Sequence, residues 1–134
     1  MRASLVAGLL AVTAATTASA ATTATTALRV TYWDHVAKPS ESITWTLRCN
    51  PARGSLPRPA RACARLAAGG ARLFARLPRN IVCTEIYGGP QKARIVGVVD
   101  GKHVWSTFTR TNGCEIGRWQ RISPWLVPPG GVTS

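Results

Sequence analysis

Four cysteines are the residues whose type and number most directly predict chemistry in this sequence: Cys49, Cys63, Cys83 and Cys114. An even number of cysteines in a small secreted chain predicts disulfide bonds, and four cysteines allow three pairings, of which the sequential one is the simplest. The sequence contains no CxxC and no cluster of Cys and His at the spacing of a zinc site. We therefore expect two structural disulfides, with no metal and no other cofactor.

Side chains for acid–base catalysis are scarce. The 134 residues include 5 Asp and Glu and 2 His, against 17 Lys and Arg, which gives a formal net charge of +12. His35 and His103 are expected to be a loop residue and a sheet residue. Glu85 and Glu115 could stand as a carboxylate pair, but no sequence feature turns such a pair into a hydrolase. We therefore do not expect an enzyme.

The first 20 residues predict an export signal. Arg2 provides a positive start, residues 3–15 form a short apolar run, and Ala18-Ser19-Ala20 supplies the small residues of a cleavage site. These are the three parts of a secretory signal peptide. The apolar run is too short to span a bilayer, so we expect secretion without stable membrane insertion.

Residues 21–134 are expected to form a single domain, which the mixture of patterns places in the α+β class. Alternation of apolar and polar residues predicts strands over residues 28–33, 43–48, 93–99, 102–110 and 119–127. A 3.6-residue periodicity over residues 60–77 predicts helix, which Gly69-Gly70 either kinks or divides into two short helices. We expect a small antiparallel sheet packed with one or two helices. Its core covers about residues 28–127, and a loose tail follows from residue 128.

The Asp100-Gly101 pair between two of these strands predicts a tight hairpin turn. A two-residue turn places Val98 opposite His103 and Val96 opposite Trp105 on one face. On the other face, Val99 lies opposite Lys102 and Gly97 opposite Val104. Both faces of the hairpin then carry apolar groups, which favours a sheet covered on both sides. We expect the helix on one face and a partner subunit on the other.

The helix predicted over residues 60–77 carries arginines on a face separate from its apolar stripe: Arg61, Arg65, Arg72, Arg76 and Arg79. With the 5 Trp of the chain, they could bind an anionic partner. For a secreted chain, anionic envelope polymers or lipid are more natural partners than nucleic acid. A solvated surface is the simpler explanation, and a cationic secreted protein that binds envelope polymers is the alternative function.

Several short motifs resemble the Streptomyces subtilisin inhibitor family, in the same order along the chain. Cys83-Thr84-Glu85-Ile86-Tyr87, followed by a turn with Pro90, resembles the reactive loop of that family. The remaining motifs match its helix and its second half: Cys63-Ala64-x-Leu66 with Gly69-Gly70, Gly97-x-x-x-Gly101-Lys102-x-Val104, and Asn112-x-Cys114-Glu115. The resemblance covers roughly residues 28–115.

The resemblance implies a secreted, homodimeric inhibitor of extracellular serine proteases, chiefly of the subtilisin type. It also implies the sequential disulfides Cys49–Cys63 and Cys83–Cys114. The reactive bond of the family lies two residues after the third cysteine. This makes Glu85 the residue before the scissile bond (P1) and Ile86 the residue after it (P1′), with Cys83, Thr84 and Tyr87 at P3, P2 and P2′.

A neighbouring polar residue is expected to support this loop. Asn112 lies two residues before Cys114, which the implied pairing ties to the loop. We therefore expect Asn112 to brace the loop by hydrogen bonds, the alternative being an ordinary turn residue.

Two features depart from the family pattern. Family members that act on subtilisin generally offer an apolar or long P1 side chain, and a carboxylate such as Glu85 is costly to desolvate in an apolar pocket. Glu85 therefore favours a glutamate-preferring serine protease as the target, with His or Arg in its P1-binding pocket. The alternative is that the chain is a broad and weaker inhibitor of subtilisins. Residues 117–121 are also more basic and aromatic than the family pattern, so the resemblance does not support the strand over residues 119–127.

Overall fold

The structure, a computed structural model, describes residues 8–18 and 25–131. Residues 8–18 are exposed and form neither helix nor strand. The rest of the predicted export signal, with its cleavage site, lies outside the described residues, so the signal stays a prediction. Within the described ranges, no helix is long and apolar enough to cross a membrane.

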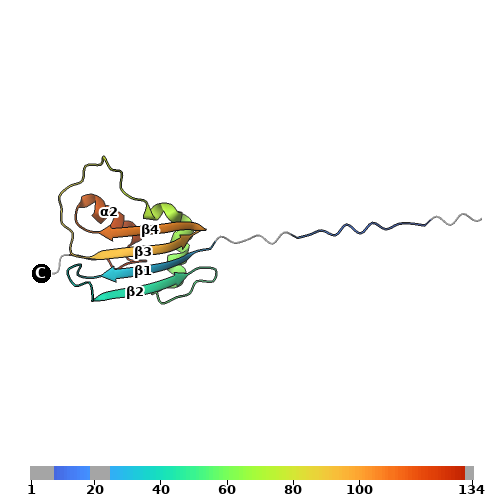
Figure 1. Ribbon diagram of the computed structural model, residues 1–134, viewed down its shortest axis with the longest axis horizontal. Helices are drawn as coiled ribbons and strands as arrows, with labels where there is room; N and C mark the ends of the chain where they lie inside the picture. Colours follow the sequence, from blue (N-terminus) through green and yellow to red (C-terminus); the bar gives the residue numbers. More distant parts are fainter. Residues whose placement is uncertain (1–7, 19–24, 132–134) are drawn as a thin grey trace, which may run out of the picture.

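Four antiparallel strands form a single sheet in the order β2-β1-β3-β4 (Figure 1). Their bounds are β1 Ala27–Trp33, β2 Ser42–Arg48, β3 Lys92–Val99 and β4 Lys102–Thr109. The two residues between β3 and β4 form the predicted turn, and Val96 pairs with Trp105 in the predicted register. The α+β class, these strands and the hairpin register are therefore confirmed.

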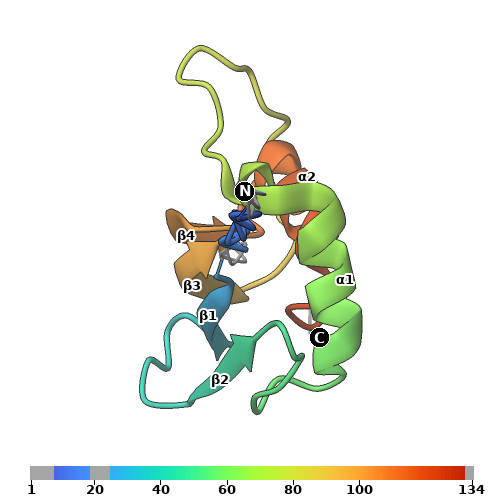
Figure 2. The ribbon, with the colours of Figure 1, turned by 90° about the vertical axis from the view of Figure 1, so that its right-hand side faces the viewer.

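Helices cover one face of the sheet (Figure 2). They are α1 Pro59–Gly69, the 3₁₀ helix η1 Gly70–Phe74 and α2 Gly113–Ile122. Gly70 has a φ of 65°, a conformation that favours glycine, and α1 ends before it. The periodic segment is therefore divided into two helices, as the Gly-Gly pair allowed.

Helix α2 overturns the strand predicted over residues 119–127. Asn112 caps the helix, since its side-chain oxygen accepts a hydrogen bond from the Glu115 amide at 2.9 Å. An Asn followed three residues later by a Glu is typical of a helix start. Here that pair, Asn112 and Glu115, precedes the apolar residues Trp119 and Ile122. These two residues are three apart and fully buried, so the segment follows a helical spacing.

The core lies between the sheet and the helices. Its largest fully buried side chains come from all four strands, from α1 and α2 and from the segment after α2: Val30, Leu47, Leu66, Ile95, Val99, Phe108, Trp119, Ile122, Leu126 and Val127. The Cys49–Cys63 disulfide joins the residue after β2 to α1 at the edge of this core. This bond confirms the first of the two implied pairings.

The segment after α2 is attached to the fold. The Trp119 indole donates a hydrogen bond to the Pro128 carbonyl, and the Gln91 amide donates to the Gly131 carbonyl, both at 2.9 Å. Gly131 N–H also donates to the Gln91 side-chain oxygen. The prediction of a loose tail is therefore wrong for residues 128–131, because buried polar side chains use that backbone as their partner.

Within residues 8–18 and 25–131, no helix packs on the opposite face of the sheet (Figure 2). Trp105 and Val96, paired across β3 and β4, are 59% and 38% exposed. Arg94 lies with its guanidinium carbon 5.8 Å from the centroid of the Trp105 ring. This face is open in the single chain, and its covering by a partner subunit stays a prediction.

Candidate functional site

Residues 75–91, between η1 and β3, form the longest connection between the described elements. In both views the segment projects away from the sheet and the helices (Figures 1 and 2). Its tip is exposed, with Val82 at 95%, Ile86 at 61% and Tyr87 at 55%. Exposed apolar side chains on a projecting segment are suited to insertion into the cleft of another protein.

The first anchor of this loop is the start of α2. Cys83 is disulfide-bonded to Cys114, with the two Cα atoms 5.4 Å apart. Beside this disulfide, the amide of Gly113, which precedes Cys114, donates a hydrogen bond of 2.9 Å to the carbonyl of Thr84, which follows Cys83. The second implied disulfide is therefore confirmed, and a covalent bond and a main-chain bond hold the same stretch of loop.

The second anchor lies at the end of β4. The Gly88 amide donates to the Arg110 carbonyl at 2.7 Å, and Arg110 Nε donates back to the Gly88 carbonyl at 3.0 Å. Gly88 is buried, and a Cβ there would lie 2.8 Å from the Ile116 side chain. The Arg110 guanidinium also lies over the Trp119 ring, 5.9 Å from its centroid. Sequence reasoning missed Arg110, because no local sequence pattern indicates that a basic residue after a strand binds the backbone of a distant loop.

Glu85, Ile86 and Tyr87 occupy the span between the two anchors, and all three are exposed. No hydrogen bond within residues 25–131 uses their main-chain groups. Their N–H and C=O groups are thus available to pair with an extended strand of another protein. The structure places all five predicted loop residues together, with the proposed scissile bond between the two anchored ends.

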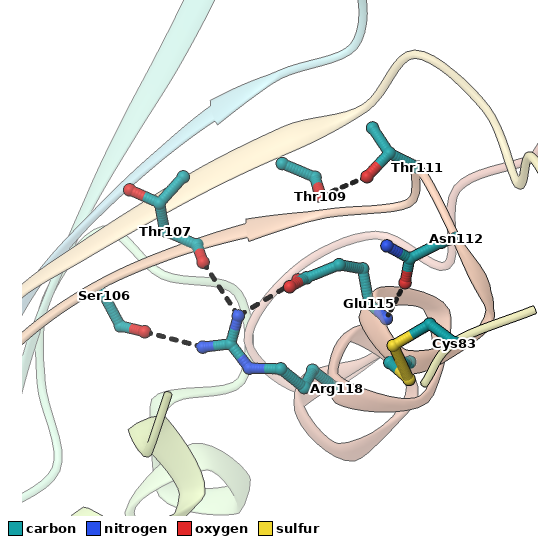
Figure 3. Close-up of polar contacts among 9 residues, drawn as sticks. Cys83, Ser106, Thr107, Thr109, Thr111, Asn112, Glu115 and Arg118 are labelled. Carbon is teal, nitrogen blue, oxygen red and sulfur yellow. Dashed lines mark hydrogen bonds and ion pairs between the residues drawn. A yellow bond between two sulfur atoms is a disulfide. The ribbon is translucent and has the colours of Figure 1, made fainter. Parts of the chain in front are cut away.

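The polar residues singled out from the sequence lie elsewhere. The Asn112 side-chain oxygen does not brace the loop directly; it accepts a hydrogen bond from the Glu115 main-chain amide in the first turn of α2 (Figure 3). It therefore supports the loop indirectly, by fixing the helix start that carries Cys114. Glu115 forms an ion pair with Arg118 at 3.0 Å, and His35 and His103 are exposed.

Glycine at position 113 lets Thr84 pack against the helix start. A Cβ on Gly113 would overlap the Thr84 hydroxyl and lie 3.3 Å from Thr84 Cβ. Under the inhibitory role that the resemblance implies, Gly113→Ala should displace the loop and raise the inhibition constant by roughly tenfold, with little change in melting temperature. Inhibition constants for a sensitive protease measure this.

Gly117 is a matched control on the same helix, because a Cβ there meets nothing within 4 Å. Gly117→Ala should leave inhibition unchanged and stabilise the fold by about 0.5–1 kcal/mol. Equal inhibition constants for the two alanine variants would contradict the packing role of Gly113.

Comparison with known proteins identifies the family of this chain. Residues 22–112 match the family described as subtilisin inhibitor-like. The chain belongs to this family. Subtilisin inhibitor-like protein 1 of Streptomyces cacaoi is 40% identical in an alignment of 76 residues that covers 53% of this chain and 67% of that protein. The class predicted from the sequence, a serine protease inhibitor rather than an enzyme, is thereby confirmed.

A solved structure also resembles the chain. It is Streptomyces caespitosus sermetstatin in complex with Bacillus licheniformis subtilisin, with a TM-score of 0.49 and 27% identity. The alignment covers 75% of this chain and 96% of sermetstatin. The subtilisin inhibitor-like match ends at residue 112, so the whole of α2, with Cys114, lies beyond it.

Proposed function

We propose that this chain inhibits an extracellular serine protease by offering Glu85-Ile86 as a substrate-like reactive bond. The single observation that carries the proposal is the position of these residues. They are exposed, and they lie between a disulfide-linked anchor at Cys83 and a hydrogen-bonded anchor at Gly88. A protease cleft would pair with the main chain of this span and take the Glu85 side chain in its P1-binding pocket.

The two anchors account for inhibition rather than simple cleavage. A loop already held at both ends loses little conformational entropy when it docks, which favours tight binding. If the protease cuts after Glu85, the disulfide keeps that end beside α2 and the Gly88 bonds keep the other end beside β4. The new termini stay close together, so resealing of the bond competes with release. The inhibitor supplies no catalytic group of its own.

Glu85 selects the target that we propose. A carboxylate entering a closed pocket needs a cationic or hydrogen-bonding partner there, because an unpaired buried charge is costly. A glutamate-preferring serine protease provides such a pocket, and a subtilisin with an apolar pocket would be bound more weakly. The formal charge of +12 would also speed encounter with an acidic enzyme.

An inhibition panel tests this function. The oxidised protein is assayed against a glutamate-specific serine protease, a subtilisin, a trypsin and a chymotrypsin. The proposal expects the lowest inhibition constant for the glutamate-specific enzyme, a higher one for subtilisin and none measurable for trypsin. Absence of inhibition of all four enzymes would overturn it.

The five arginines predicted on one helix face support a second candidate function, although this helical region ends at Phe74, and Arg76 and Arg79 lie in the loop after η1. All five are exposed, and the ion pairs found within the described residues, Lys38–Glu41 and Arg118–Glu115, involve none of them. An uncompensated basic surface is suited to an anionic envelope polymer. Binding of that kind would weaken steeply with salt and would not depend on Glu85.

We also propose that the chain is secreted and forms a homodimer through the open face of the sheet. Trp105 and Val96 provide the exposed apolar centre of that face. Trp105→Glu should then shift the protein from dimer to monomer at micromolar concentration, which sedimentation velocity measures. Gln120→Glu makes the same change in charge at an exposed position of α2 and should leave the dimer intact. A monomeric wild type, or a dimer that survives Trp105→Glu, contradicts this interface.

A further inference from the structure

The two anchors of the loop belong to different elements. Gly113 and Cys114 lie in the first turn of α2, whereas Arg110 follows the end of β4. The span of loop that they hold therefore depends on how α2 sits against β4. We propose that Arg118 is the positioning residue that fixes this placement and thereby sets the distance between the anchors. The inference rests on the function proposed above.

Arg118 joins both elements through one guanidinium group (Figure 3). Its Nη1 donates to the Thr107 carbonyl of β4 at 3.1 Å and to the Glu115 carboxylate of α2 at 3.0 Å. Its Nη2 donates to the Ser106 hydroxyl of β4 at 2.9 Å. Glu115 lies in the same helical turn as Cys114, so the network reaches the residue that carries the loop disulfide.

The surroundings of this guanidinium restrict it to one arrangement. Arg118 is only 8% exposed, and its guanidinium carbon lies 4.3 Å from the centroid of the Phe108 ring. Its Nε is buried without a hydrogen-bond partner among the described residues. The three bonds of the two Nη atoms are therefore the only side-chain hydrogen bonds that the Arg118 guanidinium makes among the described residues. Because a buried donor without a partner is unfavourable, these bonds hold the guanidinium in place. A planar fork makes these divergent bonds together, and a lysine ammonium at the same site does not.

The consequence is a division of roles in holding the loop. The disulfide and the Gly88 bonds fix the ends of the loop locally, and Arg118 fixes the two local sites relative to each other. Loss of the network would leave the disulfide intact but allow α2 to shift against β4, which would weaken the main-chain hydrogen bonds of both anchors. The loop would then dock less tightly and be cleaved faster, because resealing needs both new termini in place.

Arg118→Met tests the proposal, since methionine retains an apolar stem over Phe108 and removes all three bonds. We expect a roughly tenfold or greater rise in the inhibition constant and in the rate of cleavage after Glu85. Arg121→Met, at an exposed position of the same helix, is the control and should match wild type. Arg118→Lys keeps the positive charge but lacks the planar guanidinium, so it should behave like Arg118→Met. It replaces Arg118→Met in the test if the methionine variant folds poorly.

A measurement without protease separates this inference from the proposed function. Hydrogen exchange is followed at the amides of Gly113 and Gly88, which bond across the two anchors. Loss of the network should speed exchange at both amides by about tenfold or more, while amides in β1 and β3 stay protected. Unchanged exchange at both glycines in a folded Arg118→Met or Arg118→Lys variant would overturn the inference. Wild type that inhibits no protease would overturn only the function.

Discussion

Replacing Glu85 with lysine is expected to transfer inhibition from a glutamate-specific protease to a trypsin. The side chain at this position is exposed, and the main-chain bonds that hold the loop begin one residue before it and end at Gly88. The substitution should therefore change what enters the P1-binding pocket without changing how the loop is presented. Placing the wrong charge in a closed pocket costs about 2–5 kcal/mol, or roughly 30- to 5,000-fold in the inhibition constant.

The specificity change needs a charge-matched control. Glu41→Lys makes the same substitution at another exposed loop position, where it breaks only a solvent-exposed pair with Lys38. This variant should keep the wild-type inhibition profile. Glu85→Met should in turn favour subtilisin, because its apolar pocket accepts an uncharged side chain. If Glu85→Lys and Glu41→Lys give the same profile across the panel, Glu85 does not occupy the P1-binding pocket.

Removing the Cys83–Cys114 disulfide should convert the inhibitor into a substrate. With Cys83→Ser/Cys114→Ser, the loop keeps its main-chain bonds at Thr84 and Gly88 but loses the covalent tether. We expect the inhibition constant to rise by about a hundredfold or more and cleavage to run to completion. The bond closes a separation of 31 residues, so chain entropy also predicts a loss of about 3–4 kcal/mol in stability.

The second disulfide distinguishes a local effect from general destabilisation. Cys49–Cys63 closes 14 residues between the end of β2 and α1, away from the loop. Cys49→Ser/Cys63→Ser should cost about 3 kcal/mol by the same chain-entropy argument. It should nevertheless inhibit as wild type does below its melting temperature. Equal losses of inhibition in the two double variants would contradict a specific role for the loop tether.

Local signals predicted the sheet because they act over few residues. The Asp100-Gly101 turn fixes the pairing of Val96 with Trp105, and alternation defines the strands that join it. The Gly69-Gly70 pair marked the break between α1 and η1 for a similar reason, since glycine at a φ of 65° ends a helix locally. The loop over residues 83–87 was predicted from the resemblance of its motif to the reactive loop of the family.

The parts that the sequence did not predict depend on long-range packing. Residues 119–127 alternate well enough to suggest a strand, and only the cap between Asn112 and Glu115 indicates the helix that forms. Arg110 and Arg118 resemble the other arginines of a strongly basic chain. Their roles arise from contacts with Gly88 and Ser106, residues that are distant in the sequence or lie on another element. No local pattern separates a buried arginine from an exposed one.

The most direct test of the account is to locate the bond that a protease cuts. The oxidised inhibitor is incubated with a sensitive serine protease, quenched in acid and analysed by intact mass and by N-terminal sequencing before and after reduction. The account predicts one cleavage, with a new N-terminus at Ile86, and two fragments that stay linked by Cys83–Cys114 until the disulfides are reduced. Inhibition accompanied by cleavage at another bond, with Glu85-Ile86 left intact, would contradict it.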